Sequence, residues 1–251
     1  MVLHGGSQGE LTLYGMPTEY VYEWTQEELQ SERIDIGGGE RIPTLRDVIE
    51  LYDGVEDTLL NIELKGPESP DFKPRYDFTK AAQVVYDLIL EYGIAHKVMI
   101  SSFQPEIISA IKEVSMGNRQ FMVHRLTDDK QGDNPETYKV HQHTEGVNLY
   151  IPFLSKSLAE GIQTKGGFVG VWWSAKRQTE DEEMYDTVMK EAGVDLFYSD
   201  KPLEAMRYRD ELLASQKISD TTSDGKPASL SSSSDQDEQG LAEADGPADS
   251  Q

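Results

Sequence analysis

Apolar and polar residues alternate with a period of two over residues 59–66, "LNIELKGP". In a β-strand this period places the aliphatic side chains of Leu60, Ile62 and Leu64 on one face. The polar side chains of Asn61, Glu63 and Lys65 then lie on the opposite face. A strand with one solvated face would carry this pattern, and so would a strand that contributes to an active site. The surrounding elements decide between the two interpretations.

The rest of the pattern alternates between helices and strands. Helices are predicted over 44–53, 76–93, 104–117, 154–166, 179–193 and 202–215, from 3.6-residue apolar periods and their capping signals. The first of these begins with a Thr44–Asp47 capping box and stops at Gly54. In the second, Val84, Val85, Leu88 and Ile89 are expected on the buried side. Strands are predicted near 59–65, 97–103, 119–124, 146–150, 168–174 and 195–200.

Strands that alternate with helices indicate a mostly parallel sheet that is covered on its faces. The predicted class is therefore α/β, with a TIM (β/α)8-type barrel as the architecture. In such a barrel Glu63 and Lys65 point toward the axis near the carboxyl end of their strand, where active sites lie. Charged groups in such a place need partners or a metal ion, which favours the functional interpretation. Only six strands are predicted, whereas a closed barrel has eight.

Composition limits the possible partners. The chain of 251 residues carries a formal net charge of −23, which argues against nucleic acid and anionic membrane surfaces. It has no cysteine, and no apolar run approaches membrane-spanning length. Its first ten residues, "MVLHGGSQGE", lack the pattern of a signal peptide, which favours a cytoplasmic location. The sequence leaves the compartment of the full-length protein and the oligomeric state open.

The composition changes near the end of the chain. Residues 216–251 contain six Asp, two Glu and two Lys, a net charge of −6, together with a run of serines and no aromatic residue. Such a segment cannot bury enough apolar surface to offset the entropy cost of ordering. We expect a barrel-type domain over 1–215 and a disordered acidic, Ser-rich tail over 216–251.

Five stretches, in this order, are similar to the glycerophosphodiester phosphodiesterase family. They are "GGERIPTLRDVIEL", "LNIELK", "VMISSFQPEIISAIKE", "GFVGVWWS" and "AGVDLFYSDKP", and together they span about residues 1–205. The resemblance implies a TIM barrel that hydrolyses glycerophosphodiesters to glycerol 3-phosphate and an alcohol with a divalent cation, Mg or Ca. By match with the family, Glu63 is a metal ligand, Lys65 contacts the phosphate, His4 is the catalytic histidine and Trp173 lines the substrate pocket.

These residue types suit the chemistry that the resemblance implies. A divalent cation and a lysine can neutralise a phosphodiester as charge develops on it. A histidine can transfer protons near neutral pH. Without the family match, His4 would equally be a solvated histidine near the terminus, and Trp173 would be more typical of a core.

The sequence departs from the family at its start. The family has a His-Arg-Gly on its first strand and a Glu-x-Asp on its second, and neither precedes His4. We therefore expect a barrel that lacks the first strand and most of the second. A chain with one carboxylate and one histidine should hold a divalent cation poorly and have little activity.

Two other functions stay open. A non-catalytic relative would bind phosphate compounds or a protein partner, and the missing motifs favour it. A phospholipase D-type lyase on the same barrel would act on choline lipids, and the absence of cysteine disfavours it.

Overall fold

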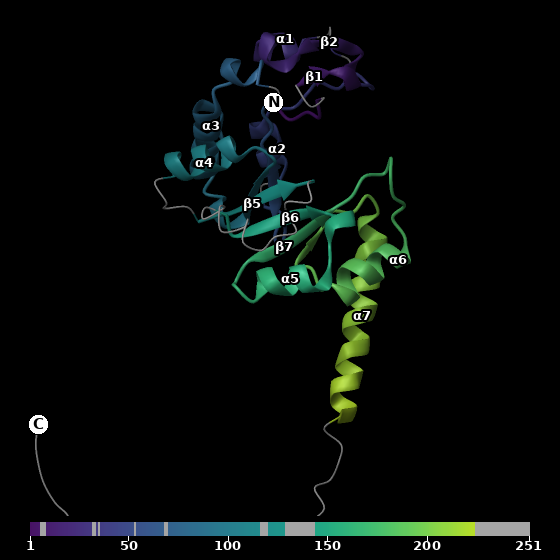
Figure 1. Cartoon of the computed structure of the whole chain (residues 1–251). Helices are drawn as coiled ribbons and strands as arrows, with labels where there is room; N and C mark the ends of the chain where they lie inside the picture. The colour runs from purple at the N-terminus through teal and green to yellow at the C-terminus, as the bar shows by residue number, and fades with distance from the viewer. Residues whose placement is uncertain are drawn as a thin grey trace, which may run out of the picture. The chain divides into compact units, whose positions relative to one another are not determined.

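Six strands pair in parallel in the order in which they follow along the chain (Figure 1). They are β3 (Leu60–Glu63), β4 (Val98–Ser102), β5 (Met122–Thr127), β6 (Gly146–Tyr150), β7 (Phe168–Trp172) and β8 (Leu196–Phe197). The structure is a computed structural model, which describes residues 1–5, 9–31, 34, 36–52, 54–67, 70–115, 120–128 and 144–223. Within these residues the parallel sheet curls as an incomplete TIM-type barrel, which confirms the predicted fold class.

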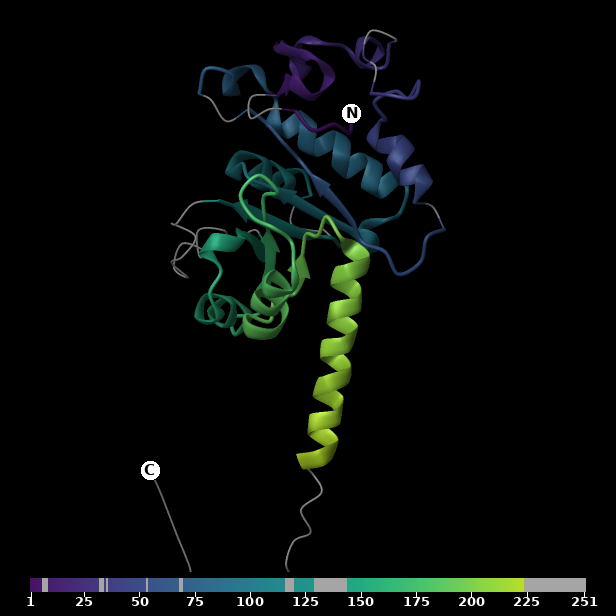
Figure 2. The ribbon, with the colours of Figure 1, turned by 90° about the vertical axis from the view of Figure 1, so that its right-hand side faces the viewer.

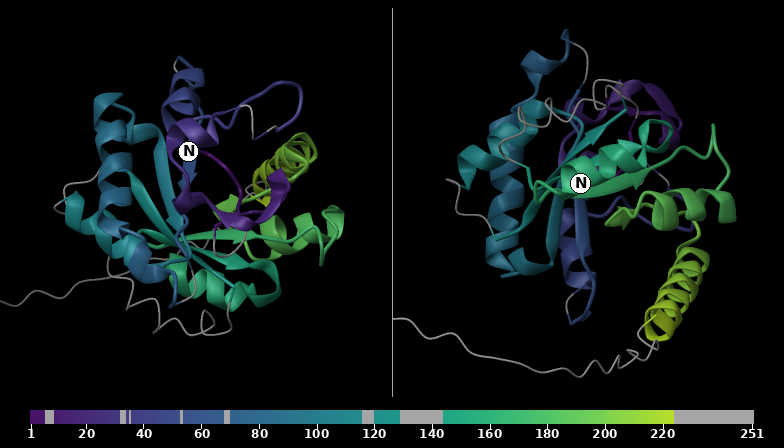
Figure 3. Two further views of the ribbon diagram at one scale, coloured as in Figure 1. Left: turned by 90° about the horizontal axis from the view of Figure 1, so that it is seen from above. Right: turned by 60° about the horizontal axis from the view of Figure 1, so that its bottom comes forward.

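Helices connect β3 to β4, β4 to β5, β6 to β7 and β7 to β8, as expected for parallel strands. They are α2 (Leu45–Leu51) before β3, α3 (Phe78–Glu91), α4 (Pro105–Val114), α5 (Lys156–Gln163) and α6 (Glu182–Tyr185), which continues as a wider helical segment over Asp186–Glu191. Thr44 and Asp47 form the predicted capping box of α2. Seen from the end of the strands, α3, α4 and α5 lie along the outer side of the curled sheet (Figure 3).

The aliphatic face of the sheet packs against these helices. Ile62, Val98 and Ile100 share one core cluster with residues of α3 and α4, which run side by side (Figure 2). Val147 and Val169 form a second cluster with α5. This packing leaves the other face of each strand for the barrel interior. One detail of the prediction is wrong: Val84 is 52% exposed, because the buried stripe of α3 follows Ala82, Val85 and Ile89.

An N-terminal segment, for which the sequence pattern predicts no elements, has a small core of its own. It contains the antiparallel strands β1 (Glu10–Leu11) and β2 (Met16–Tyr20) and the short helix α1 (Gln26–Leu29). Its buried residues are Leu11, Leu29, Ile34 and Ile42. Short elements with little regular period give a weak signal in sequence, which explains why they are not predicted.

The last helix, α7 (Pro202–Ser223), continues beyond the predicted end at residue 215. The chain divides into two units, Met1–Arg209 and Asp210–Gln251. Residues 224–251, most of the predicted disordered tail, lie outside the described part of the structure, so the tail stays a prediction. Among the residues that are described, no helix is both long and apolar enough to span a membrane.

Candidate active site

Strand β3 carries two of the predicted site residues at its carboxyl end. Ile62 and Leu64 are buried against the helices, as the period of two predicts. Glu63 ends β3 on the opposite face, and Lys65 follows two residues later. Both side chains are partly accessible, with 32% of the Glu63 side chain and 38% of the Lys65 side chain exposed. A ligand can therefore reach both groups.

His4 joins them from the start of the chain. Its Nε2 lies 3.1 Å from Nζ of Lys65, and Oε1 of Glu63 lies 3.6 Å from the same Nζ. The lysine ammonium can only donate hydrogen bonds, so this contact is a hydrogen bond for the His4 tautomer that carries its proton on Nδ1 and leaves Nε2 as the acceptor. The cluster thus combines a cation that can bind a phosphate oxygen with a basic nitrogen that can take a proton.

The residues of this cluster do not form a divalent-cation site by themselves. Mg²⁺ and Ca²⁺ require about six oxygen ligands, several of them usually carboxylates. Across the described ranges, no group of three or more His, Asp or Glu side chains could hold a metal ion. At Glu63, the nearest charged partner is the ammonium of Lys65, which would repel a metal ion. The predicted role of Glu63 as a metal ligand therefore stays a prediction.

Trp173, the predicted pocket residue, is half-buried directly after β7. Its neighbour Trp172 packs against two aromatic rings and makes one hydrogen bond to the backbone. The Trp172 ring stacks on Tyr150 at 4.6 Å and meets the edge of Phe103 at 5.5 Å, and its Nε1 donates to the carbonyl oxygen of Thr127 at 3.1 Å. These three aromatic rings come from the carboxyl ends of β4, β6 and β7. Sequence reasoning chose Trp173 by family match and missed Trp172, although the period of two places Trp172 on the inward face with Gly170.

A chain of polar side chains crosses the barrel interior. Nδ2 of Asn61 and Nδ2 of Asn148 both donate to the hydroxyl of Tyr198, at 3.3 and 3.0 Å. Nδ1 of His124 lies 3.3 Å from Oδ1 of Asn148. Burial raises the pKa of Tyr198, so its hydroxyl keeps its proton. Gly170 makes room for this chain, since a Cβ there would lie 1.7 Å from Oδ1 of Asn148.

His124 belongs to this polar chain through its contact with Asn148. The side chain is 1% exposed, and burial lowers its pKa. It is therefore a structural residue that stays neutral. His141 and His143, which form a His-x-His pair in the sequence, lie outside the described residues.

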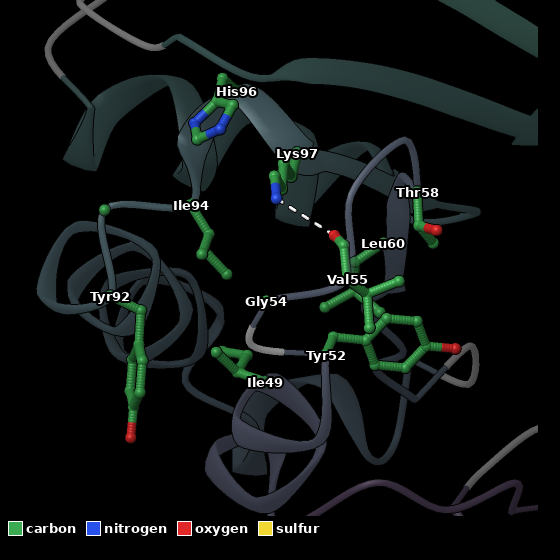
Figure 4. A pocket seen from close by; sticks show the side chains of 11 residues that line it. Ile49, Tyr52, Gly54, Val55, Thr58, Leu60, Tyr92, Ile94, His96 and Lys97 are labelled. Carbon is green, nitrogen blue, oxygen red and sulfur yellow. Dashed lines mark hydrogen bonds between the residues drawn. The ribbon is translucent and has the colours of Figure 1, made fainter.

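A cavity of about 190 Å³ lies at the other end of the strands (Figure 4). Its lining includes Leu60 at the start of β3 and Lys97 just before β4, with Tyr92 and His96 nearby. Nζ of Lys97 donates to the carbonyl oxygen of Val55 at 3.1 Å across its rim (Figure 4). Active sites of α/β barrels lie at the carboxyl ends of the strands, so this cavity at the amino ends is not the candidate site.

Several solved structures share this fold. A glycerophosphodiester phosphodiesterase from Parabacteroides distasonis is 18% identical, with 79% of this chain and 74% of that chain covered and a TM-score of 0.59. A protein from Galdieria sulphuraria assigned to the same activity is 24% identical, with 83% and 79% covered and a TM-score of 0.66. A phosphodiesterase from Oleispira antarctica, in complex with the product sn-glycerol-3-phosphate, is 18% identical, with 76% and 73% covered and a TM-score of 0.57.

At these identities the structural likeness establishes the fold alone. A search of curated proteins found no match. The sequence model of the glycerophosphoryl diester phosphodiesterase family, however, matches residues 2–204, which is most of the chain. The site described above, with His4, Glu63 and Lys65, lies inside the matched range. The chain therefore belongs to the glycerophosphoryl diester phosphodiesterase family.

Proposed function

We propose that the chain binds glycerophosphodiesters at the His4–Glu63–Lys65 cluster and hydrolyses them to glycerol 3-phosphate and an alcohol. The observation that carries the proposal is the placement of the Lys65 ammonium and the His4 imidazole 3.1 Å apart at the carboxyl end of β3. Family membership supports the substrate class. The product bound to the Oleispira antarctica relative is consistent with it.

In this proposal Lys65 binds a non-bridging oxygen of the phosphodiester and neutralises its charge as the bond to water forms. His4 accepts a proton from that water at Nε2. The bond between phosphorus and the alcohol oxygen breaks, and the alcohol leaves with a proton from solvent. Glu63, with Oε1 3.6 Å from Nζ, holds the Lys65 ammonium.

A second candidate function is binding without hydrolysis. The observation that favours it is the single carboxylate of the cluster, Glu63, which has the Lys65 ammonium 3.6 Å away. Such a pair can hold an anionic phosphate, but it offers little to activate a nucleophile. The described residues do not bring enough ligands to Glu63 to hold the predicted Mg or Ca ion.

The test is glycerol 3-phosphate release by the full chain from glycerophosphocholine, glycerophosphoethanolamine and glycerophosphoinositol. Lys65→Met should lower kcat/KM about ten- to a hundredfold, the effect of losing one charge-assisted hydrogen bond. Lys165→Met, at an exposed lysine after α5, should leave it unchanged. Binding of the diesters without release would support the second candidate, and release that is equal in Lys65→Met would refute the proposed site.

A further inference from the structure

Two buried polar side chains hold the backbone on both sides of Lys65. Oγ of Ser102 donates to the carbonyl oxygen of Leu64 at 2.8 Å, and Oε1 of Gln104 accepts from the amide of Gly66 at 3.3 Å. Ser102 ends β4, and Gln104 is the residue before α4. The two peptide groups that flank Lys65 are therefore both fixed from the neighbouring strand.

Ser102 and Gln104 also contact each other. Oγ of Ser102 accepts from the amide of Gln104 at 3.1 Å and lies 3.2 Å from Oε1 of the same residue. Ser102 is 0% exposed and Gln104 is 6% exposed. A buried polar group is costly unless its hydrogen bonds are made, and here the partners are the backbone groups next to Lys65. We call this pair the Ser102–Gln104 clamp.

A third contact holds Lys65 itself. The hydroxyl of Tyr76 donates to the carbonyl oxygen of Lys65 at 3.1 Å. The Tyr76 ring packs edge-on against Phe78, with ring centroids 4.9 Å apart. Phe78 in turn closes over Gly66, where a Cβ would lie 2.7 Å from Cε1 of Phe78. Only glycine fits at this position without a shift, so the backbone after Lys65 has little freedom.

We propose that the Ser102–Gln104 clamp positions Lys65 for phosphate binding. A lysine has a flexible four-carbon side chain, so the place of its ammonium depends on a fixed Cα and on the partners at its tip. The clamp fixes the Cα, and His4 and Glu63 hold the tip. Ser102 and Gln104 are positioning residues, because they touch the backbone beside Lys65 and not the substrate. The identity of the ligand rests on the proposed function. The hydrogen bonds that fix the backbone beside Lys65 do not depend on it.

The first test follows Lys65 without any ligand. Lysines of the full chain are reductively methylated with 13C, and Lys65→Met assigns the Lys65 signal. Ser102→Ala and Gln104→Leu should shift or broaden that signal and leave the Lys165 signal in place, and Ser102→Thr, which keeps the hydroxyl, should restore it. Ser115→Ala is the matched control, since Ser115 is also a buried serine that donates to a backbone carbonyl, that of Lys112 at 3.1 Å. An unmoved Lys65 signal in both clamp variants would overturn the proposal.

The second test measures binding of glycerol 3-phosphate by 31P NMR at millimolar ligand. Ser102→Ala should weaken binding about three- to tenfold in the wild-type background and have no further effect beside Lys65→Met, because coupled residues are not additive. Equal losses in both backgrounds would show that Ser102 acts on the fold and not through Lys65. If the wild type binds no glycerol 3-phosphate, the proposed function fails, and the Lys65 signal alone decides the role of the clamp.

Discussion

Nζ of Lys65 lies 3.1 Å from Nε2 of His4, although 61 residues separate them in the chain. Since an ammonium only donates, a hydrogen bond between the two groups requires that Nε2 of His4 carries a lone pair. If a phosphate oxygen replaced His4 as the acceptor of the hydrogen bond from Lys65, the lone pair on Nε2 would be free to accept from a water molecule. The contact thus brings Lys65 and His4, the proposed binding group and the proposed base, together in one site.

Loss of the imidazole should separate binding from catalysis. His4→Gln keeps a polar group that can accept from Lys65 but cannot transfer a proton. We expect kcat to fall about 10²- to 10⁴-fold, as on removal of a general base, with little change in KM. Steady-state kinetics on glycerophosphocholine measure this. His96→Gln, in the cavity at the amino ends of the strands, is the control, and an equal loss in both variants would count against a role for His4.

Removal of divalent cations should not affect the binding of glycerol 3-phosphate. The described residues bring one carboxylate, Glu63, to the cluster, and its nearest charged partner is the Lys65 ammonium. We expect the Kd by calorimetry to agree within about twofold with EDTA and with millimolar Mg²⁺ or Ca²⁺, because one carboxylate beside an ammonium holds such ions poorly. A marked tightening by either cation would contradict this expectation and would show that other residues complete a metal site.

The loop after β8 depends on one buried carboxylate. Glu180 is 2% exposed, and its carboxylate accepts from the hydroxyls of Tyr185, at 2.8 Å, and Ser199, and from the amide of Asp200 at 2.7 Å. Glu180→Ala leaves these donors without a partner, so we expect a loss of about 3 kcal/mol in the free energy of unfolding. Urea denaturation measures it. Glu182→Ala, on the exposed first turn of α6, should change it by less than about 0.5 kcal/mol, and similar losses in both would refute the account.

Stability should also decrease on mild acidification because of His124. Burial lowers the pKa of this imidazole in the folded chain below its usual value of 6.5. The unfolded chain therefore binds a proton first, and the free energy of unfolding falls as the pH drops through and below about 6.5. His124→Gln removes this contribution. The stability difference between wild type and variant should be constant above pH 7 and shrink toward pH 5, and a difference that stays the same over this range would contradict the assignment.

The sequence predicts the parts of the site that depend on local pattern. The period of two in "NIELK" places Glu63 and Lys65 away from the helices, and the capping box places the start of α2. Contacts between distant segments are not visible in such patterns. His4 was identified by family resemblance alone, and Glu180 was indistinguishable from the acidic helix start that follows it. The clamp on Lys65 was missed for the same reason, since "SSFQPE" gives the strand end and helix start but not the partners of Ser102 and Gln104.

The most direct measurement is a 31P NMR titration of glycerophosphocholine with the full chain, which reports binding by the diester signal and hydrolysis by the glycerol 3-phosphate signal. The account predicts that the wild type and Lys165→Met perturb the diester signal and then produce the monoester. It also predicts that Lys65→Met binds about ten- to a hundredfold more weakly. An unperturbed diester signal with the wild type, or an equal perturbation with Lys65→Met, would contradict the claim that Lys65 is the phosphate-binding residue of this protein.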